Sequence, residues 1–191
     1  MVAILLLVLG VILLLIIMVA VYIFKTQRQL VNLDELCKNA MSQIAVQLNS
    51  RWDAVLALAK LAGQYAKHES ETMVKTIEAR RQAQVNTAED VMQQQGELTQ
   101  IMGRLMAIGE AYPDLKANQN FLQLQTEIAD IENKIAAVRR YFNTATRELN
   151  NAVQTFPSNI LAGMFGFKKE PMFEIPQEDR ATIEKAPEIK F

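Results

Sequence analysis

The sequence predicts an all-α membrane protein, in which an N-terminal transmembrane helix continues into an elongated antiparallel bundle of three long helices and a short C-terminal helix. The first observation behind this prediction is that residues 1–24 carry no charged side chain. The second is that apolar residues beyond the anchor recur at steps of three and four, the period of a helix that buries one face. The third is that proline, which ends helices most effectively, first occurs at Pro113.

Residues 1–24 are predicted to be the transmembrane anchor. At about 1.5 Å per residue they reach about 36 Å, and the hydrocarbon core of a bilayer is about 30 Å thick. A signal peptide has a basic start and a small-residue cleavage site; this segment has neither, so we expect it to be retained. Tyr22 and Phe24 stand where an aromatic belt would meet the lipid headgroups.

The basic residues beside the anchor predict its orientation. Lys25, Arg28 and Lys38 follow the apolar segment, and no basic residue precedes it. Cytoplasmic flanks of membrane helices carry an excess of lysine and arginine, so this asymmetry favours a cytoplasmic bundle. Asp34 and Glu35 lie in the same flank and weaken the asymmetry.

Residues 25–174 are predicted to form the bundle, and its first helix is expected to continue the anchor. Between Gly10 and Gly63 there is neither glycine nor proline, so nothing in the sequence separates the two helices. We expect the first helix to end between Gly63 and Lys67. Its apolar stripe consists of Leu33, Leu36, Ala40, Ile44, Leu48, Trp52, Val55, Ala59 and Ala62.

The second helix is predicted from Ser70 to Glu110 and has a weak middle. Polar residues occupy the apolar stripe there, and Gly96 costs about 1 kcal/mol relative to alanine inside a helix. We therefore expect bending or fraying between Arg80 and Glu97.

The third helix has the clearest pattern in the chain, a coiled-coil seam that needs facing helices. A turn at Tyr112, Pro113 and Asp114 precedes it, because proline fixes φ and cannot continue a helix. Its seam consists of Phe121, Leu124, Ile128, Ile131, Ile135, Val138, Phe142, Ala145, Leu149 and Ala152.

Three alternating helices would place two candidate segments at opposite ends of the bundle. The turn formed by Tyr112, Pro113, Asp114 and Asn120 is expected to lie near the bilayer. The segment from 156 to 173 is expected about 55 Å away, where it would close the bundle or bind a partner. The candidate residues of that segment are Phe156, Pro157, Phe165, Phe167, Lys168 and Lys169. Residues 175–191, rich in Pro, Glu and Lys, are predicted to be a disordered tail.

The residue types argue against several classes of function. The chain has one histidine, His68, and one cysteine, Cys37, which would lie near opposite ends of the first helix, so we expect no catalytic pair and no metal site. Nothing has the spacing of a phosphate-binding loop, so no cofactor or small-molecule substrate is predicted. A net charge of −1 disfavours nucleic-acid binding.

Two sets of polar residues beside the seam suggest contacts between helices. The side-chain amides of Gln43, Gln47, Asn120, Gln123 and Gln125 either fix helix register by hydrogen bonds or form an ordinary polar face. Arg139 and Arg140 are expected to pair with the acidic residues Glu127, Asp130 or Glu132.

With these patterns in place, the chain resembles the LemA family of bacterial membrane-associated proteins. The resemblance covers about residues 29–174. It rests on the runs NAMSQI (39–44), VQL (46–48), GQYAKHE (63–69), EAYPDLKANQNFLQLQ (110–125), ENKIA (132–136), RRYFN (139–143), FPSN (156–159) and GFKK (166–169). Met41, Ala45, Trp52 and Ala57 depart from the residues usual in the family, which affects packing and no catalytic residue.

The resemblance implies an N-terminal anchor in the bacterial inner membrane, a long helical bundle and no known catalytic residue. Many relatives have features that would place the bundle outside the cytoplasm, so the side of the membrane stays open. Some relatives belong to magnetosome membrane formation, which suggests a membrane-organising role. We therefore expect a non-enzymatic scaffold that contacts the lipid bilayer and self-associates as a homo-oligomer. The alternative is an adaptor or accessory subunit of a membrane enzyme such as a protease.

Overall fold

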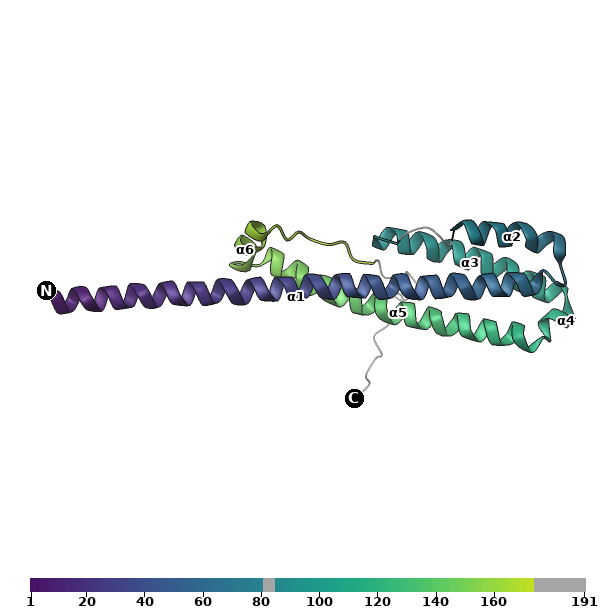
Figure 1. The fold of residues 1–191 in the computed structure, drawn as a ribbon, viewed down its shortest axis with the longest axis horizontal. Coiled ribbons are helices and arrows are strands. Elements are labelled where there is room, and N and C mark those ends of the chain that lie inside the picture. Colours follow the sequence, from purple (N-terminus) through teal and green to yellow (C-terminus); the bar gives the residue numbers. More distant parts are fainter. Residues whose placement is uncertain (81–84, 174–191) are drawn as a thin grey trace, which may run out of the picture.

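The computed structural model describes residues 1–80 and 85–173 of the 191-residue chain. These residues form six helices, and no strand occurs among them. Figure 1 shows an elongated molecule in which α1 (Val2–Ala62) runs from end to end and the other helices pack along its C-terminal part. The predicted all-α fold, with an apolar N-terminal helix that continues into an antiparallel bundle, is confirmed. The predicted tail, residues 175–191, lies outside the described residues.

Helix α1 is a single unbroken helix of 61 residues, so the predicted continuity between anchor and bundle is confirmed. It spans about 90 Å at the usual helical rise. It ends where the backbone N–H of Gly63 donates to the carbonyl oxygen of Ala59 at 3.0 Å. Among the described residues, α1 is the one helix long and apolar enough to cross a membrane, and its most apolar stretch is not covered by protein.

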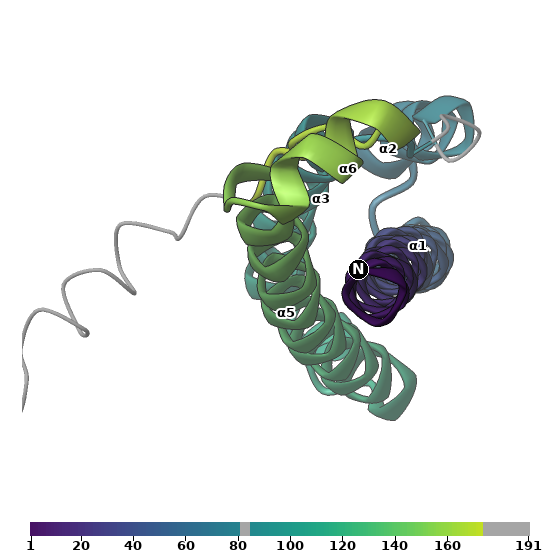
Figure 2. The ribbon, with the colours of Figure 1, turned by 90° about the vertical axis from the view of Figure 1, so that its left-hand side faces the viewer.

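The bundle is built around α1, which contacts α2, α3, α5 and α6. Viewed along its axis, the other helices form a crescent around it (Figure 2). This arrangement explains why α1 buries a single stripe near the anchor and several faces around Trp52, farther along. The core along α1 consists of Leu30, Leu33, Cys37, Ala40, Ile44, Leu48, Trp52, Ala54, Val55, Leu56, Leu58, Ala59 and Ala62.

Helix α5 (Gln119–Gln154) is the predicted third helix, and most of its seam is buried against α1. Its direction is antiparallel to α1. Arg51 forms an ion pair with Glu132, and the Sγ of Cys37 lies 3.5 Å from the Oγ1 of Thr146. The two contacts are fourteen residues apart along each helix, so the helices keep one register over this distance.

The predicted second helix is in fact two helices that run in opposite directions. Helix α2 (Lys67–Arg80) returns along α1, and Glu78 lies 3.3 Å from Lys60. Helix α3 (Ala88–Ala111) then runs away from the anchor. The expected weak point between Arg80 and Glu97 is where the chain reverses, and residues 81–84 lie outside the described part.

A capping box at the start of α3 explains why a new helix begins there. The Thr87 Oγ1 accepts a hydrogen bond from the Asp90 N–H at 3.1 Å, and the Asp90 carboxylate accepts from the Thr87 N–H at 2.9 Å. These bonds satisfy donors that a helix start leaves unpaired, so they favour a new helix at this position. The sequence carries the signal for this cap, a threonine followed three residues later by an aspartate. The prediction of one continuous helix did not take it into account.

Replacing Thr87 with alanine is expected to lower the free energy of unfolding by about 1 kcal/mol, because the cap is lost. Urea denaturation followed by circular dichroism measures this difference. Thr99→Ala is the matched control on the same helix, since the Thr99 hydroxyl donates only to the helix carbonyl of Gln95. Equal stability of Thr87→Ala and the wild type would contradict the importance of the cap.

The capping box also predicts a pH dependence. Hydrogen bonds from the backbone N–H of Asn86, and then from Thr87, lower the pKa of the Asp90 carboxyl. A lowered folded-state pKa stabilises the protein above the ordinary pKa of about 4, and this stabilisation is lost as the pH falls below it. We expect Asp90→Asn to lose less stability than the wild type as the pH falls below the ordinary carboxyl pKa of about 4.

Because the chain makes four passes rather than three, the ends of the bundle are exchanged relative to the prediction. After α3, the short helix α4 (Pro113–Lys116) forms the expected turn at Pro113. The Nδ2 of Asn118 lies 3.4 Å from the Tyr65 hydroxyl, just beyond the far end of α1. The turn containing Tyr112, Pro113, Asp114 and Asn120 therefore lies at the end of the bundle away from the apolar part of α1, whereas it was expected at the same end as that part.

Candidate functional site

The segment after α5 lies beside the anchor end of α1, not at the far end where it was expected. An open groove of about 410 Å³ separates the two. Tyr22 and Thr26 of α1 line it on one side, and Thr155 and Ser158 line it on the other. Since the apolar run ends at Phe24, this end of the bundle is level with the last turn of the predicted anchor.

Helix α6 (Ser158–Phe165) is joined to the end of α5 by hydrogen bonds at its first residue, and its last turn is closed by a bond of its own. The Ser158 hydroxyl reaches the carbonyl oxygens of Ala152 at 2.7 Å and Thr155 at 2.8 Å. At the other terminus, Gly166 adopts φ 80°, a left-handed conformation that favours glycine. The Phe167 N–H then donates to the Ala162 carbonyl at 3.0 Å. Figures 1 and 2 show α6 lying crosswise to α1.

After α6 an extended strap, residues 167–173, returns along α5 and is fixed by two asparagines. Asn150 donates to the Glu170 carbonyl and accepts from the Glu170 N–H, both at 2.9 Å. Asn143 makes the same pair of bonds with Phe173, at 3.0 and 2.8 Å. Seven helical residues and three extended residues both span about 10 Å, so the spacings on α5 and on the strap match.

The end of the strap is buried. The Phe173 ring is 3% exposed and packs edge to face on Phe142, with the ring centroids 5.1 Å apart. The Arg139 guanidinium lies 4.9 Å from the centroid of the Phe173 ring. The strap therefore anchors α6 to the core through both backbone bonds and apolar packing.

The double variant Asn143→Ala, Asn150→Ala is expected to release the strap. Each asparagine forms two hydrogen bonds with the strap backbone, and the loss should be about 1–2 kcal/mol per site. Amide hydrogen exchange at Glu170 and Phe173 should become faster, while exchange in the middle of α5 stays slow. Asn151→Ala is the control, because Asn151 is exposed and neighbours Asn150. Unchanged exchange at Glu170 would contradict this role of the asparagines.

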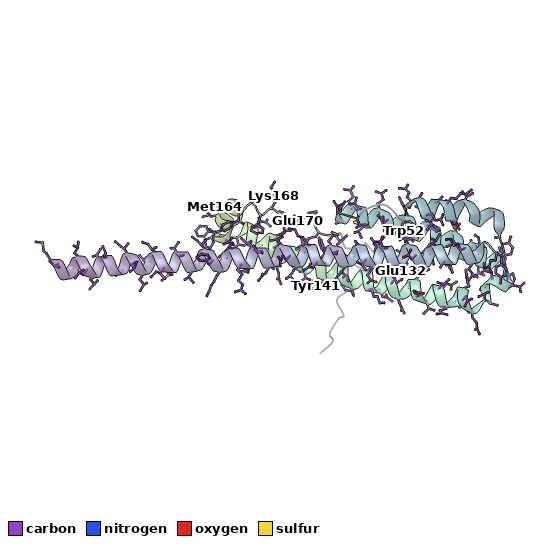
Figure 3. The ribbon with its side chains drawn as sticks, in the orientation of Figure 1. Trp52, Glu132, Tyr141, Met164, Lys168 and Glu170 are labelled. Atoms are coloured by element: carbon purple, nitrogen blue, oxygen red, sulfur yellow. The ribbon has the colours of Figure 1, made fainter. Side chains whose placement is uncertain are left out.

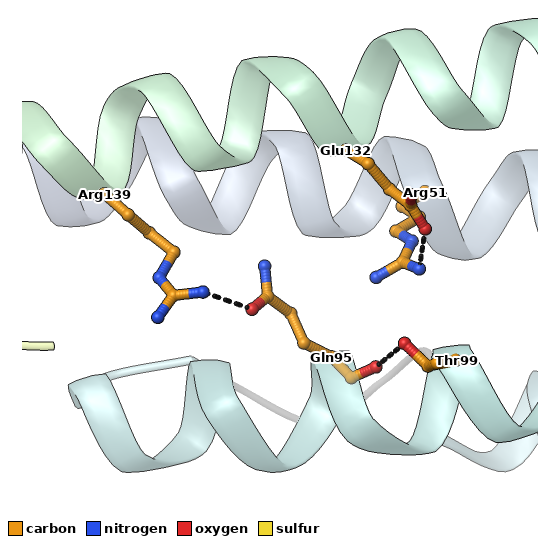
Figure 4. A network of polar contacts seen from close by, with 5 residues as sticks. All are labelled: Arg51, Gln95, Thr99, Glu132 and Arg139. Atoms are coloured by element: carbon orange, nitrogen blue, oxygen red, sulfur yellow. Dashed lines mark hydrogen bonds and ion pairs between the residues drawn. The ribbon is translucent and has the colours of Figure 1, made fainter. Parts of the chain in front are cut away.

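A second set of polar contacts joins α1, α3 and α5 within the bundle (Figure 4). Arg51 is 3% exposed, and Glu132 pairs with it across the α1–α5 interface. Burial lowers the pKa of the Arg51 guanidinium, and the Glu132 carboxylate acts in the opposite direction. The Arg139 guanidinium donates to the Gln95 Oε1 at 3.0 Å. These contacts tie helices together and include no side chain placed as a nucleophile beside a base.

The predicted interhelical contacts differ in detail from the observed ones. Glu132 pairs with Arg51, and Arg139 reaches Gln95 on α3. The buried amide contact is made by Gln94, whose Oε1 accepts from the Trp52 Nε1–H at 3.0 Å. Pairing of this kind depends on the register of distant helices, so Gln94 and Gln95 could not be selected from their own surroundings in the sequence.

The structure also places the single cysteine of the chain and the two lysines that follow α6. Cys37 is 5% exposed, and burial raises the pKa of its thiol, so the reactive thiolate is suppressed. In residues 1–80 and 85–173, no group of three His, Cys, Asp or Glu side chains is placed to hold a metal ion. Lys168 and Lys169 are exposed, and Phe167 is half-buried and packs against the hydrophobic core.

Comparison with known proteins shows a family match over most of the chain. The family model described as the LemA family matches residues 40–191. Protein LemA of Metamycoplasma hominis is 27% identical over 150 residues, which are 77% of this chain and 68% of that relative.

Magnetosome proteins match a shorter part. Magnetosome protein MamQ of Magnetospirillum gryphiswaldense is 36% identical over 83 residues, or 43% of this chain. Magnetosome protein MamQ 2 of Paramagnetospirillum magneticum is 34% identical over the same length. The match spans only 30% of the length of each of these two relatives. None of these names denotes an enzyme activity. The apolar helix and these similarities describe a membrane-associated helical protein.

Proposed function

Because this chain belongs to the LemA family, we propose that it is a non-enzymatic, single-pass membrane scaffold that self-associates and organises membrane or partner proteins. The observation that carries this proposal is the continuity of α1, which joins the apolar segment to the bundle core without a hinge. A rigid connection of this kind holds the bundle at a defined position relative to the bilayer. The magnetosome relatives support a membrane-organising role by analogy.

The proposal places the anchor in the bacterial inner membrane. The apolar run of residues 1–24 supports a spanning helix, and Lys25 and Arg28 support a cytoplasmic bundle by the excess of basic residues on one flank. The side of the membrane can be tested by attaching a reporter to the C-terminus that is active only in the cytoplasm or only outside it.

A groove between α1 and α5 supports self-association. It has a volume of about 330 Å³, and Val46, Val138 and Lys134 are among the residues that line it. Val46 is 57% exposed, although it lies on the helix that forms the centre of the bundle. Covering Val46 with an apolar side chain of another copy would remove this surface from water.

The mass of the particle in mild detergent tests the proposal. We expect a homomeric assembly several times the 21.6 kDa of one chain. Val46→Glu should shift this assembly toward the monomer, whereas Met92→Glu, on the exposed face of α3, should not. A monomer that copurifies stoichiometrically with one membrane enzyme would overturn the scaffold and favour an adaptor.

A further inference from the structure

Helix α6 buries one apolar face against the bundle and leaves a second apolar face exposed. Ile160 and Met164 lie four residues apart on α6 and are 54% and 74% exposed, and Phe156, in the turn just before the helix, is 75% exposed. Leu161 and Ala162, on the other side, are buried against the bundle. An exposed stripe of large apolar side chains is costly in water, because such surface is favoured in an apolar environment.

The position of α6 identifies the environment that would cover this stripe. Ser158, the first residue of α6, lines the same groove as Tyr22 and Thr26. Figure 2 looks from the anchor side and shows α6 across the end of the bundle, facing the viewer. In Figure 3, Met164 lies at the anchor side of the segment, and Lys168 and Glu170 lie farther from the anchor. A helix in this position lies parallel to the bilayer plane when α1 crosses the membrane.

The depth of the anchor agrees with this position. The apolar run of about 36 Å slightly exceeds a hydrocarbon core of about 30 Å, whereas the bilayer with its headgroups is about 40–45 Å thick. Residues just beyond Phe24, such as Thr26, therefore lie in the headgroup region. Since α6 is level with these residues, its apolar side chains reach the boundary between headgroups and acyl chains.

Charges around α6 complement an anionic lipid surface. Lys168 and Lys169 follow α6 and are exposed, and Lys25 and Arg28 of α1 are exposed at the same end of the bundle. The acidic residues at this end of the bundle are Glu148, which lines the groove, Glu170, and Asp34 and Glu35 of α1. Lys25 and Arg28 directly follow the apolar run, whereas Asp34, Glu35 and Glu170 lie farther from the anchor, and each lysine or arginine near an anionic surface contributes favourably.

We propose that α6 and the turn before it form a second membrane contact, in which Ile160 and Met164 of the helix and Phe156 of the turn insert into an anionic bilayer beside the anchor. This inference rests on the proposed spanning role of α1 and adds a site to it. Interfacial helices of this kind bury an apolar face at the headgroup boundary and hold basic residues at the surface. Two contacts, rather than one, would stop the bundle from rotating freely about the axis of α1.

A spin label at position 164 tests the proposal in the full-length chain. The native thiol is removed by Cys37→Ala, and Met164→Cys provides the labelling site. The labelled protein is placed in vesicles of phosphatidylethanolamine and phosphatidylglycerol at about one copy per vesicle. We expect several-fold lower accessibility of the label to a water-soluble nickel reagent, and higher accessibility to oxygen, than for a control label at Leu122→Cys. Leu122 is 47% exposed on α5, near the end away from the anchor.

Labels at two further positions distinguish failure of the α6 contact from failure of the proposed membrane anchor. A label at Phe156→Cys should behave like the one at 164, and equal thermal melting shows that these exposed substitutions leave the bundle folded. A label at Leu13→Cys reports the anchor itself. If position 13 is shielded by lipid and position 164 is as open to nickel as position 122, the α6 contact is wrong and the anchor stands. If position 13 is open to nickel as well, the spanning role of α1 fails.

The same labels separate lipid from protein as the covering partner. Shielding of position 164 that requires many copies per vesicle would indicate a second chain and overturn the lipid contact. Shielding in native membranes, but not in pure lipid vesicles, would indicate a different protein and overturn it equally. Replacing phosphatidylglycerol with a zwitterionic lipid is expected to weaken the shielding at position 164 and leave position 13 unchanged.

Discussion

Trp52→Ala is expected to lower the free energy of unfolding of the bundle by about 3–5 kcal/mol, because it removes the largest buried side chain of α1. The Trp52 side chain is fully buried where α1 is surrounded by other helices. Its removal leaves a cavity that neighbouring helices fill only in part. The Gln94 side chain, which is buried on α3, also loses the Trp52 Nε1–H as a donor at 3.0 Å.

Urea denaturation in detergent, followed by circular dichroism, measures this loss. Fluorescence is unsuitable because Trp52 is the single tryptophan of the chain. Trp52→Phe retains part of the volume and removes the N–H donor, so its loss should be clearly smaller than that of Trp52→Ala. Met92→Ala, at an exposed position of α3, is the control and should change little. A wild-type midpoint for Trp52→Ala would mean that α1 and α3 do not pack at this level.

Glu132→Ala is expected to cost about 2 kcal/mol, because the buried Arg51 guanidinium loses its carboxylate partner. The Nε of Arg51 already has no hydrogen-bond partner in the described structure, so little else compensates its charge. Half of the Glu132 side chain is exposed, and water partly screens the pair, which keeps the expected loss below that for a fully buried pair.

A second substitution tests whether the cost comes from the stranded charge. Arg51→Met combined with Glu132→Ala should recover much of the stability, since methionine fills the space without a charge to desolvate. The four proteins of this double-mutant cycle give the coupling energy directly. Lys38→Ala breaks the exposed pair with Asp34 at 2.6 Å and is expected to leave stability unchanged. A double variant that is less stable than Glu132→Ala would contradict this explanation.

The two longest helices were predictable because their apolar residues keep a strict helical period and few breakers interrupt them. The stripe from Leu33 to Ala62 and the seam from Phe121 to Leu149 needed no knowledge of their partners. The polar composition of the second helical segment located the break near residue 85. It did not show that the chain reverses its direction there. A bend and a complete reversal have the same local pattern unless the capping box at Thr87 is recognised.

That one reversal determined which end of the bundle each later segment occupies. Adding a pass along α1 moves the Tyr112 turn away from the anchor and brings α6 toward it. The strap contacts of Asn143 and Asn150 were equally inaccessible, because they join a helix to an extended chain that has no periodicity of its own. Contacts between distant segments depend on the path of the chain and on the register of the helices. The local sequence pattern of one segment contains neither.

Because α1 is unbroken, the bundle tilts together with the apolar part of the helix. The part beyond Phe24 extends about 57 Å, so a tilt of about 20° from the bilayer normal, the average for membrane helices, would place the far tip roughly 20 Å to one side. Tilt responds to the match between an apolar segment and the thickness of the bilayer. A change of bilayer thickness that alters this tilt would therefore displace the turn at Pro113, at the other end of α1.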